Sequence, residues 1–109
     1  MDISPFYIIE EEGFALCLIT DGTFHPELFA SRADEGFEGN GYDVEAIAVQ
    51  YLNECAPYLI RDIIFDSEDD MFVALCEERA PLDDLAEGLT ELFADEERSK
   101  DLFSRAELI

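Results

Sequence analysis

The chain has 109 residues, the length of one domain, and 49% of them are hydrophobic, including 9 Phe and 4 Tyr. This composition supports one hydrophobic core and excludes an acidic disordered tail, because such tails lack aromatic residues. A formal net charge of −22, from 28 Asp and Glu against 6 Lys and Arg, argues against direct binding to nucleic acid or to an anionic membrane, since both require a cationic face.

The first part of the chain predicts a β-hairpin. β-branched and aromatic residues fill two arms within residues 5–20, and Glu11, Glu12 and Gly13 supply a tight turn between them. The second arm, residues 14–20, is apolar at nearly every position. This pattern predicts a central strand that is covered on both faces.

Two helices are expected next. Pro26 opens a short helix, for which Gly36 is the expected end. A longer helix is predicted over residues 43–55, with Asp43 as its N-cap and Pro57 marking its end, although residues 58–62 could equally prolong it beyond Pro57. One side of the longer helix carries apolar residues at helical spacing, namely Val44, Ile47, Ala48, Tyr51, Leu52 and Cys55.

The second half of the chain predicts another hairpin followed by helix. Strands are expected over residues 63–66 and 71–77, and Pro81 lies near the start of a long helix. Residues 98–108 are expected to form a final short helix or turn. The order β-β-α-α-β-β-α(-α) predicts an α+β fold, a four-stranded antiparallel sheet of two hairpins with helices packed on it, as a single domain over residues 1–109.

Three of the 6 glycines lie in "GFEGNGYD", residues 36–43, which we call the glycine loop. A phosphate site is rejected here, because the loop follows a helix, contains no Lys and is surrounded by carboxylates. The backbone conformations that these residue types favour give another explanation for the sequence of the loop. Gly36 can end a helix in a left-handed conformation, Asn40 and Gly41 form a turn pair tolerant of positive φ, and Tyr42 precedes the expected helix cap.

Loops held by a rigid scaffold also display binding residues, so the glycine loop is either purely structural or a contact surface as well. The candidate partner-binding residues lie in the loop and just before it: Glu35, Glu38, Asn40, Tyr42 and Asp43. Tyr42 is the expected apolar anchor, because a Tyr side chain offers a large contact area at a low entropic cost.

No catalytic or metal site is predicted. Four acids match calcium-loop positions, but that motif's glycine is replaced by Met71 and its flanks read as strands; the acids are Asp66, Glu68, Asp70 and Glu77. His25 is the only histidine, and the three cysteines lie in apolar runs without ligand spacing, which predicts buried thiols in a reducing cytoplasm; they are Cys17, Cys55 and Cys76. No nucleophile and base stand out as a pair, so we expect neither enzymatic activity nor a cofactor.

Two segments resemble the immunity protein 51 family of bacterial polymorphic toxin systems. They are "RADEGFEGNGYDVEAIA", residues 32–48, and "DLFSRAEL", residues 101–108. The resemblance spans nearly the whole chain, and "EGNGYD" is its most specific part, although Val44 stands where the family pattern has Trp. It implies a small acidic α+β protein whose gene neighbours a toxin gene. The matching signature positions are Glu38, Gly39, Asn40, Gly41, Tyr42, Asp43 and Arg105.

The resemblance and the charge together predict an immunity protein that binds a cognate toxin with a cationic face, such as a nuclease, and blocks it without doing chemistry. The alternative is an acidic DNA mimic or anti-restriction protein that binds a host DNA-binding protein. No secretory signal pattern and no apolar run of ~20 residues is present, so we expect a cytoplasmic protein. Whether the protein pairs with itself stays open.

Overall fold

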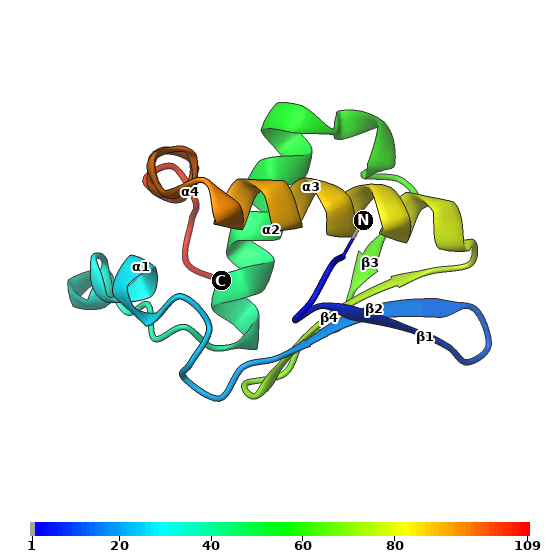
Figure 1. Ribbon diagram of the computed structural model, residues 1–109, viewed down its shortest axis with the longest axis horizontal. Coiled ribbons are helices and arrows are strands. Elements are labelled where there is room, and N and C mark those ends of the chain that lie inside the picture. Colours follow the sequence, from blue (N-terminus) through cyan, green and yellow to red (C-terminus); the bar gives the residue numbers. More distant parts are fainter. Residues whose placement is uncertain (1) are drawn as a thin grey trace.

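Two β-hairpins form one antiparallel sheet in the computed structural model, which describes residues 2–109 (Figure 1). The first hairpin consists of β1 (Tyr7–Glu10) and β2 (Phe14–Ile19), and the second of β3 (Ile64–Phe65) and β4 (Met71–Cys76). The strand order β1-β2-β4-β3 puts the two longest strands in the centre, paired along their full length. This confirms the predicted α+β fold with a sheet of two hairpins. The predicted domain includes residue 1, which lies outside the described residues.

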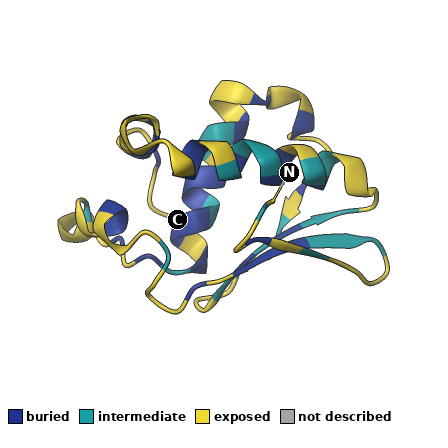
Figure 2. Cartoon of the chain, in the orientation of Figure 1, coloured by how far each residue is buried: buried dark blue, intermediate teal, exposed yellow. Residues whose placement is uncertain are grey.

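Residues 2–109 contain six helical segments. They are α1 (Pro26–Ala30), η1 (Ala33–Glu35), α2 (Gly41–Cys55), η2 (Pro57–Leu59), α3 (Arg79–Ala94) and α4 (Glu96–Phe103). The long helices α2 and α3 lie on the same side of the sheet, and their buried sides face it (Figure 2). Within residues 2–109, no helix is both long and apolar enough to cross a membrane.

The core lies between the sheet and these helices. Leu16 and Leu18 of β2 and Phe72 and Ala74 of β4 are at most 1% exposed, and they alternate with residues that point to the other side of the sheet. The side chain of Tyr51 on α2 reaches across to Gly88 of α3, where an added Cβ would lie only 2.0 Å from the Tyr51 hydroxyl oxygen. Glycine inside a helix is unfavourable by about 1 kcal/mol relative to Ala. Its presence at position 88 is explained by packing, because a larger side chain would collide with Tyr51.

The other side of the sheet, which we call the outer face, corrects one prediction. The nearly continuous apolar sequence of β2 predicts a strand covered on both faces, yet the helices of residues 2–109 cover only one (Figure 1). By strand register the outer face carries only apolar side chains, namely Tyr7, Ile9, Ala15, Cys17, Ile19, Ile64, Met71, Val73 and Leu75.

Candidate functional site

The glycine loop leads from η1 into α2, and its helix begins earlier than predicted. Asn40, not Asp43, is the N-cap of α2, and its side-chain oxygen accepts a hydrogen bond from the Asp43 N–H at 2.9 Å. The prediction of Asp43 as the cap is therefore wrong. Asn and Asp are equally good caps, so local sequence alone does not decide which of the two begins the helix.

Asp43 instead lies in the first turn of α2, where it is 2% exposed. Its Oδ2 accepts hydrogen bonds from the N–H groups of Glu38 at 2.6 Å and Gly39 at 2.8 Å. A carboxylate at a helix N-terminus is also favoured by the helix dipole. Asp43 therefore holds the glycine loop in shape, and its buried carboxylate does not face solvent.

Gly41 brings the loop against the turn between β3 and β4. Its N–H donates to the Asp69 carbonyl at 3.0 Å, and an added Cβ would lie 2.0 Å from the Glu68 carbonyl oxygen and 2.3 Å from that of Met71. Only glycine fits this position. Asn40 and Gly41 do not use the positive φ that such a turn pair tolerates; within the glycine loop a positive φ is found at Gly36 (107°), as expected, and at Gly39 (83°).

Gly36 also ends a different segment from the one predicted. Helix α1 stops at Ala30, and Gly36 in its left-handed conformation caps the 3-10 turn η1. Helix α1 starts after His25, which has a φ of 46° and contributes no side-chain cap.

Two side chains of the glycine loop face outward. Glu38 is exposed, and Tyr42, in the first turn of α2, is 40% exposed. Asn40 is half-buried, and its Nδ2 lies 3.3 Å from both the Glu38 carboxylate and the Asp69 carboxylate. Of the candidate residues within the loop, Glu38 and Tyr42 are thus the ones whose side chains a partner can reach most directly.

Glu35, the remaining candidate, is held by Arg32. The guanidinium donates two hydrogen bonds to the carboxylate, at 2.8 and 2.7 Å, and these lower the pKa of Glu35. Arg32 also donates to the carbonyl oxygens of Phe103 and Ala106 and lies 4.5 Å from the centre of the Phe37 ring. Arg32 therefore joins the start of the glycine loop to the C-terminal segment, a role that sequence reasoning did not assign to it.

Arg105, the signature residue of the C-terminal segment, makes a second such link. Its guanidinium donates two hydrogen bonds of 2.8 Å to Glu54 of α2 and forms an ion pair with Asp101 at 3.0 Å. The hydrogen bonds from Arg105 and Gln50 lower the pKa of Glu54 to about 2. Arg105 thus ties the C-terminal segment to the end of α2, while Arg32 joins the two segments that carry the family resemblance, residues 32–48 and 101–108.

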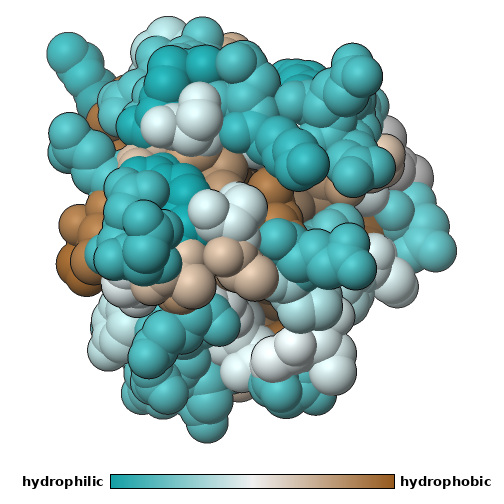
Figure 3. Space-filling model, turned by 90° about the vertical axis from the view of Figure 1, so that its left-hand side faces the viewer, coloured by the Kyte–Doolittle hydropathy of each residue, from teal (hydrophilic) through white to brown (hydrophobic). Residues whose placement is uncertain are grey.

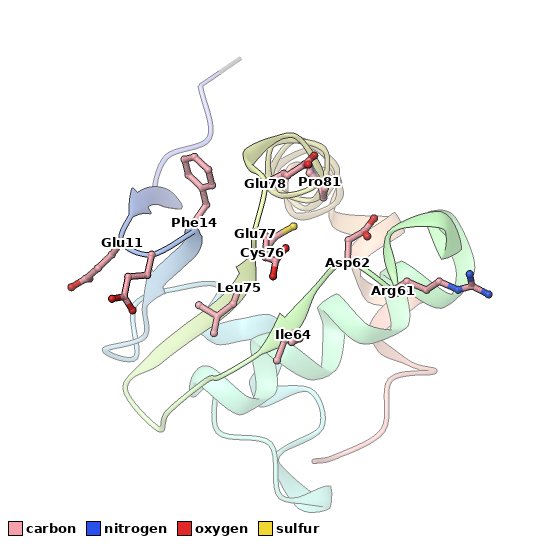
Figure 4. A pocket seen from close by; sticks show the side chains of 11 residues that line it. Glu11, Phe14, Arg61, Asp62, Ile64, Leu75, Cys76, Glu77, Glu78 and Pro81 are labelled. Atoms are coloured by element: carbon pink, nitrogen blue, oxygen red, sulfur yellow. The ribbon is translucent and has the colours of Figure 1, made fainter.

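A pocket of about 550 Å³ lies at the end of the sheet, between the first hairpin turn and the start of α3 (Figure 4). Five carboxylates line it: Glu11, Glu12, Asp62, Glu77 and Glu78. Arg61 also lines it, but its side chain extends away from the labelled carboxylates (Figure 4). Apolar side chains complete its walls, including Phe14, Ile64 and Pro81. Such a pocket suits a long cationic side chain with an apolar stem.

The other groups considered for chemistry are not gathered into a site. Across residues 2–109, no three His, Cys, Asp or Glu side chains are close enough to hold a metal ion. His25 stacks on Phe93 with 5.1 Å between ring centres, and burial lowers the His25 pKa. The prediction of buried cysteines is wrong for Cys55, which is exposed at the last residue of α2, whereas Cys17 is buried and Cys76 half-buried.

We predict that Gly41→Ala lowers the free energy of unfolding by about 2–4 kcal/mol, because the new methyl group collides with backbone that cannot move independently. Urea unfolding measures this loss. Gly22→Ala is the control, since it has a positive φ but nothing within 4 Å of an added Cβ, and we expect it to cost about 1 kcal/mol. Equal losses in the two variants would contradict the close approach at Gly41.

We predict that Glu54 stabilises the protein only while it is ionised. Its pKa in the folded protein, about 2, lies below the usual 4.5, so its contribution is complete above that usual value and is lost as the pH falls toward 2. Urea unfolding of the wild type and Glu54→Gln over this range tests it. The wild type should be more stable at neutral pH, with the difference disappearing in acid. A difference that does not change with pH would rule out an ionic contribution.

Comparison with known proteins identifies the family. The sequence model described as Immunity protein 51 matches residues 6–108, nearly the whole chain and both segments joined by Arg32. No curated protein and no solved structure shows significant similarity to the chain. The match confirms the resemblance noted in the sequence, and it implies an immunity protein. The chain therefore belongs to the immunity protein 51 family.

Proposed function

We propose that this protein is a cytoplasmic immunity protein of a bacterial polymorphic toxin system, and that it neutralises a cognate toxin by covering a cationic surface. A nuclease is the kind of toxin that fits best, because an enzyme that binds nucleic acid must carry a cationic cleft. Membership of the immunity protein 51 family supports the general role. The acidic mechanism rests on the charge distribution of the folded chain.

The observation that carries this proposal is the excess of exposed carboxylates without basic partners. The chain has 28 Asp and Glu, but ion pairs in residues 2–109 engage only Glu35, Glu54, Asp83 and Asp101. Among the acids of the described residues, only Asp43 is buried. Hydrophilic side chains cover most of the end of the molecule that carries α1 and α4 (Figure 3). The protein therefore presents a strongly negative surface to any partner.

Such a surface attracts a cationic partner over distances comparable to the Debye length and raises the rate of association, to as much as about 10⁸–10⁹ M⁻¹ s⁻¹ at low salt. Fast capture suits a protein that must protect the cell that makes the toxin. Neutralisation of the toxin needs no catalytic group on this chain, since occupying the toxin's cationic surface is enough to exclude an anionic substrate.

The glycine loop contributes to this proposal through its exposed side chains. We assign direct contact with the toxin to Glu38 and Tyr42, because both are exposed. Glu35 adds negative charge beside them, while Asn40 and Asp43 act by holding the loop in shape through their hydrogen bonds. The loop lies against the acidic turn that contains Asp69, so its contacts and those of the turn belong to one surface.

The test is co-expression with the toxin encoded by the adjacent gene. We expect the immunity protein to restore growth, and we expect the association rate of the purified pair to fall steeply when salt rises from about 0.05 to 0.5 M, because salt screens the attraction. Failure to bind that toxin, with binding to a host DNA-binding protein instead, would favour the DNA-mimic alternative. Rescue with a salt-independent association rate would refute electrostatic steering.

A further inference from the structure

The outer face of the sheet is unusually apolar for a surface that no element of residues 2–109 covers. An antiparallel sheet with one face in water ordinarily alternates apolar and polar residues, whereas continuous apolar runs belong to strands covered on both sides. Here β2 and β4 are such runs, "FALCLI" and "MFVALC". Four side chains of the outer face are substantially exposed: Ile64 at 69%, Ile19 at 56%, Ile9 at 42% and Tyr7 at 37%.

Carboxylates frame this apolar area. Each strand is followed, two residues beyond its last outer-face side chain, by an acid, namely Glu11 after β1, Asp21 after β2, Asp66 after β3 and Glu77 after β4. Asp66 still takes part in the strand pairing, because its N–H donates to the Val73 carbonyl at 2.9 Å. The outer face is therefore an apolar centre with a negative rim, the arrangement found at specific protein interfaces.

The acidic pocket at the sheet end continues this surface. Ile64 and Leu75, which pair across β3 and β4, belong to the outer face and also line the pocket (Figure 4). Beyond them lie the carboxylates of Asp62 and Glu77. A Lys or Arg side chain from a partner on the outer face could lay its stem on the apolar wall and its charged head among these carboxylates.

The charge distinguishes between two occupants of the outer face. A second copy of this chain would bring two negative rims together at a net charge of −22 per copy, which like-charge repulsion opposes. A partner whose contact surface has an apolar centre surrounded by Lys and Arg side chains complements both the apolar area and the negative rim of the outer face. The rim thus favours a cationic partner over self-association.

We infer that the outer face of the sheet is the docking surface for the toxin, which presents an apolar patch ringed by basic residues and inserts one long basic side chain into the acidic pocket. This inference rests on the proposed function and adds to it the surface that is used. The glycine loop and the turn between β3 and β4 then lie at one edge of the contact.

The test compares matched double variants in binding to the toxin encoded by the adjacent gene. Ile19→Ser with Ile64→Ser removes exposed apolar contact without changing charge, and should weaken binding by about 10- to 100-fold. Tyr58→Ser with Ile60→Ser is the control, because these residues are 67% and 44% exposed but lie in and beside η2, outside the sheet. The control should bind like the wild type. Thermal unfolding checks that each variant folds.

Charge reversals test the rim separately. Asp66→Lys with Glu77→Lys should slow association markedly, whereas Glu96→Lys with Glu97→Lys on α4, which changes the net charge equally, should have a much smaller effect. Wild-type binding that survives both the Ile and the rim substitutions would overturn the docking surface while leaving the immunity function intact. A wild type that does not bind the toxin would overturn both. A homodimer abolished by Ile19→Ser with Ile64→Ser would assign the face to self-association.

Discussion

Repulsion among carboxylates is the constraint on which the rest of this structure depends. With 28 acids and 6 basic residues, the chain must fold against its own charge, and two of the basic residues are placed where they connect distant segments. Arg32 joins the glycine loop to the C-terminal carbonyl groups, and Arg105 joins the same C-terminal segment to Glu54 of α2. Most of the other acids stay exposed on a body whose core, between sheet and helices, is apolar apart from a few satisfied polar groups.

The most specific part of the family signature is explained mainly by shape. In "EGNGYD" the glycine at 41 permits contact with backbone, Asn40 caps α2, and Asp43 binds the loop amides. Glu38 and Tyr42 are the side chains left facing outward. Most residues of this segment therefore shape the loop, and the side chains that a partner can reach lie around it.

Local patterns in the sequence predict the two hairpins, the long helix before Pro57 and the apolar side of α2, because each depends on residues close together in the chain, whereas the same patterns do not decide whether that helix continues beyond Pro57. The wrong predictions concern features that depend on contacts between residues far apart in the sequence. Asn40 rather than Asp43 begins α2, and Gly41 lies directly against the turn at Glu68. This contact joins residues far apart in the sequence, so local patterns do not reveal it. The apolar run of β2 correctly predicts a central strand, but it cannot tell a face covered by helices from one left open for another molecule.

The most direct test of this account is to map the interface in the complex with the adjacent-gene toxin, using NMR signals of labelled isoleucine methyl groups. The account predicts that Ile9, Ile19 and Ile64 on the outer face shift or broaden on binding, while the exposed Ile60 and Ile109, 44% and 61% accessible and outside the sheet, do not. Changes at Ile60 and Ile109 with unchanged signals from the three outer-face residues would contradict it.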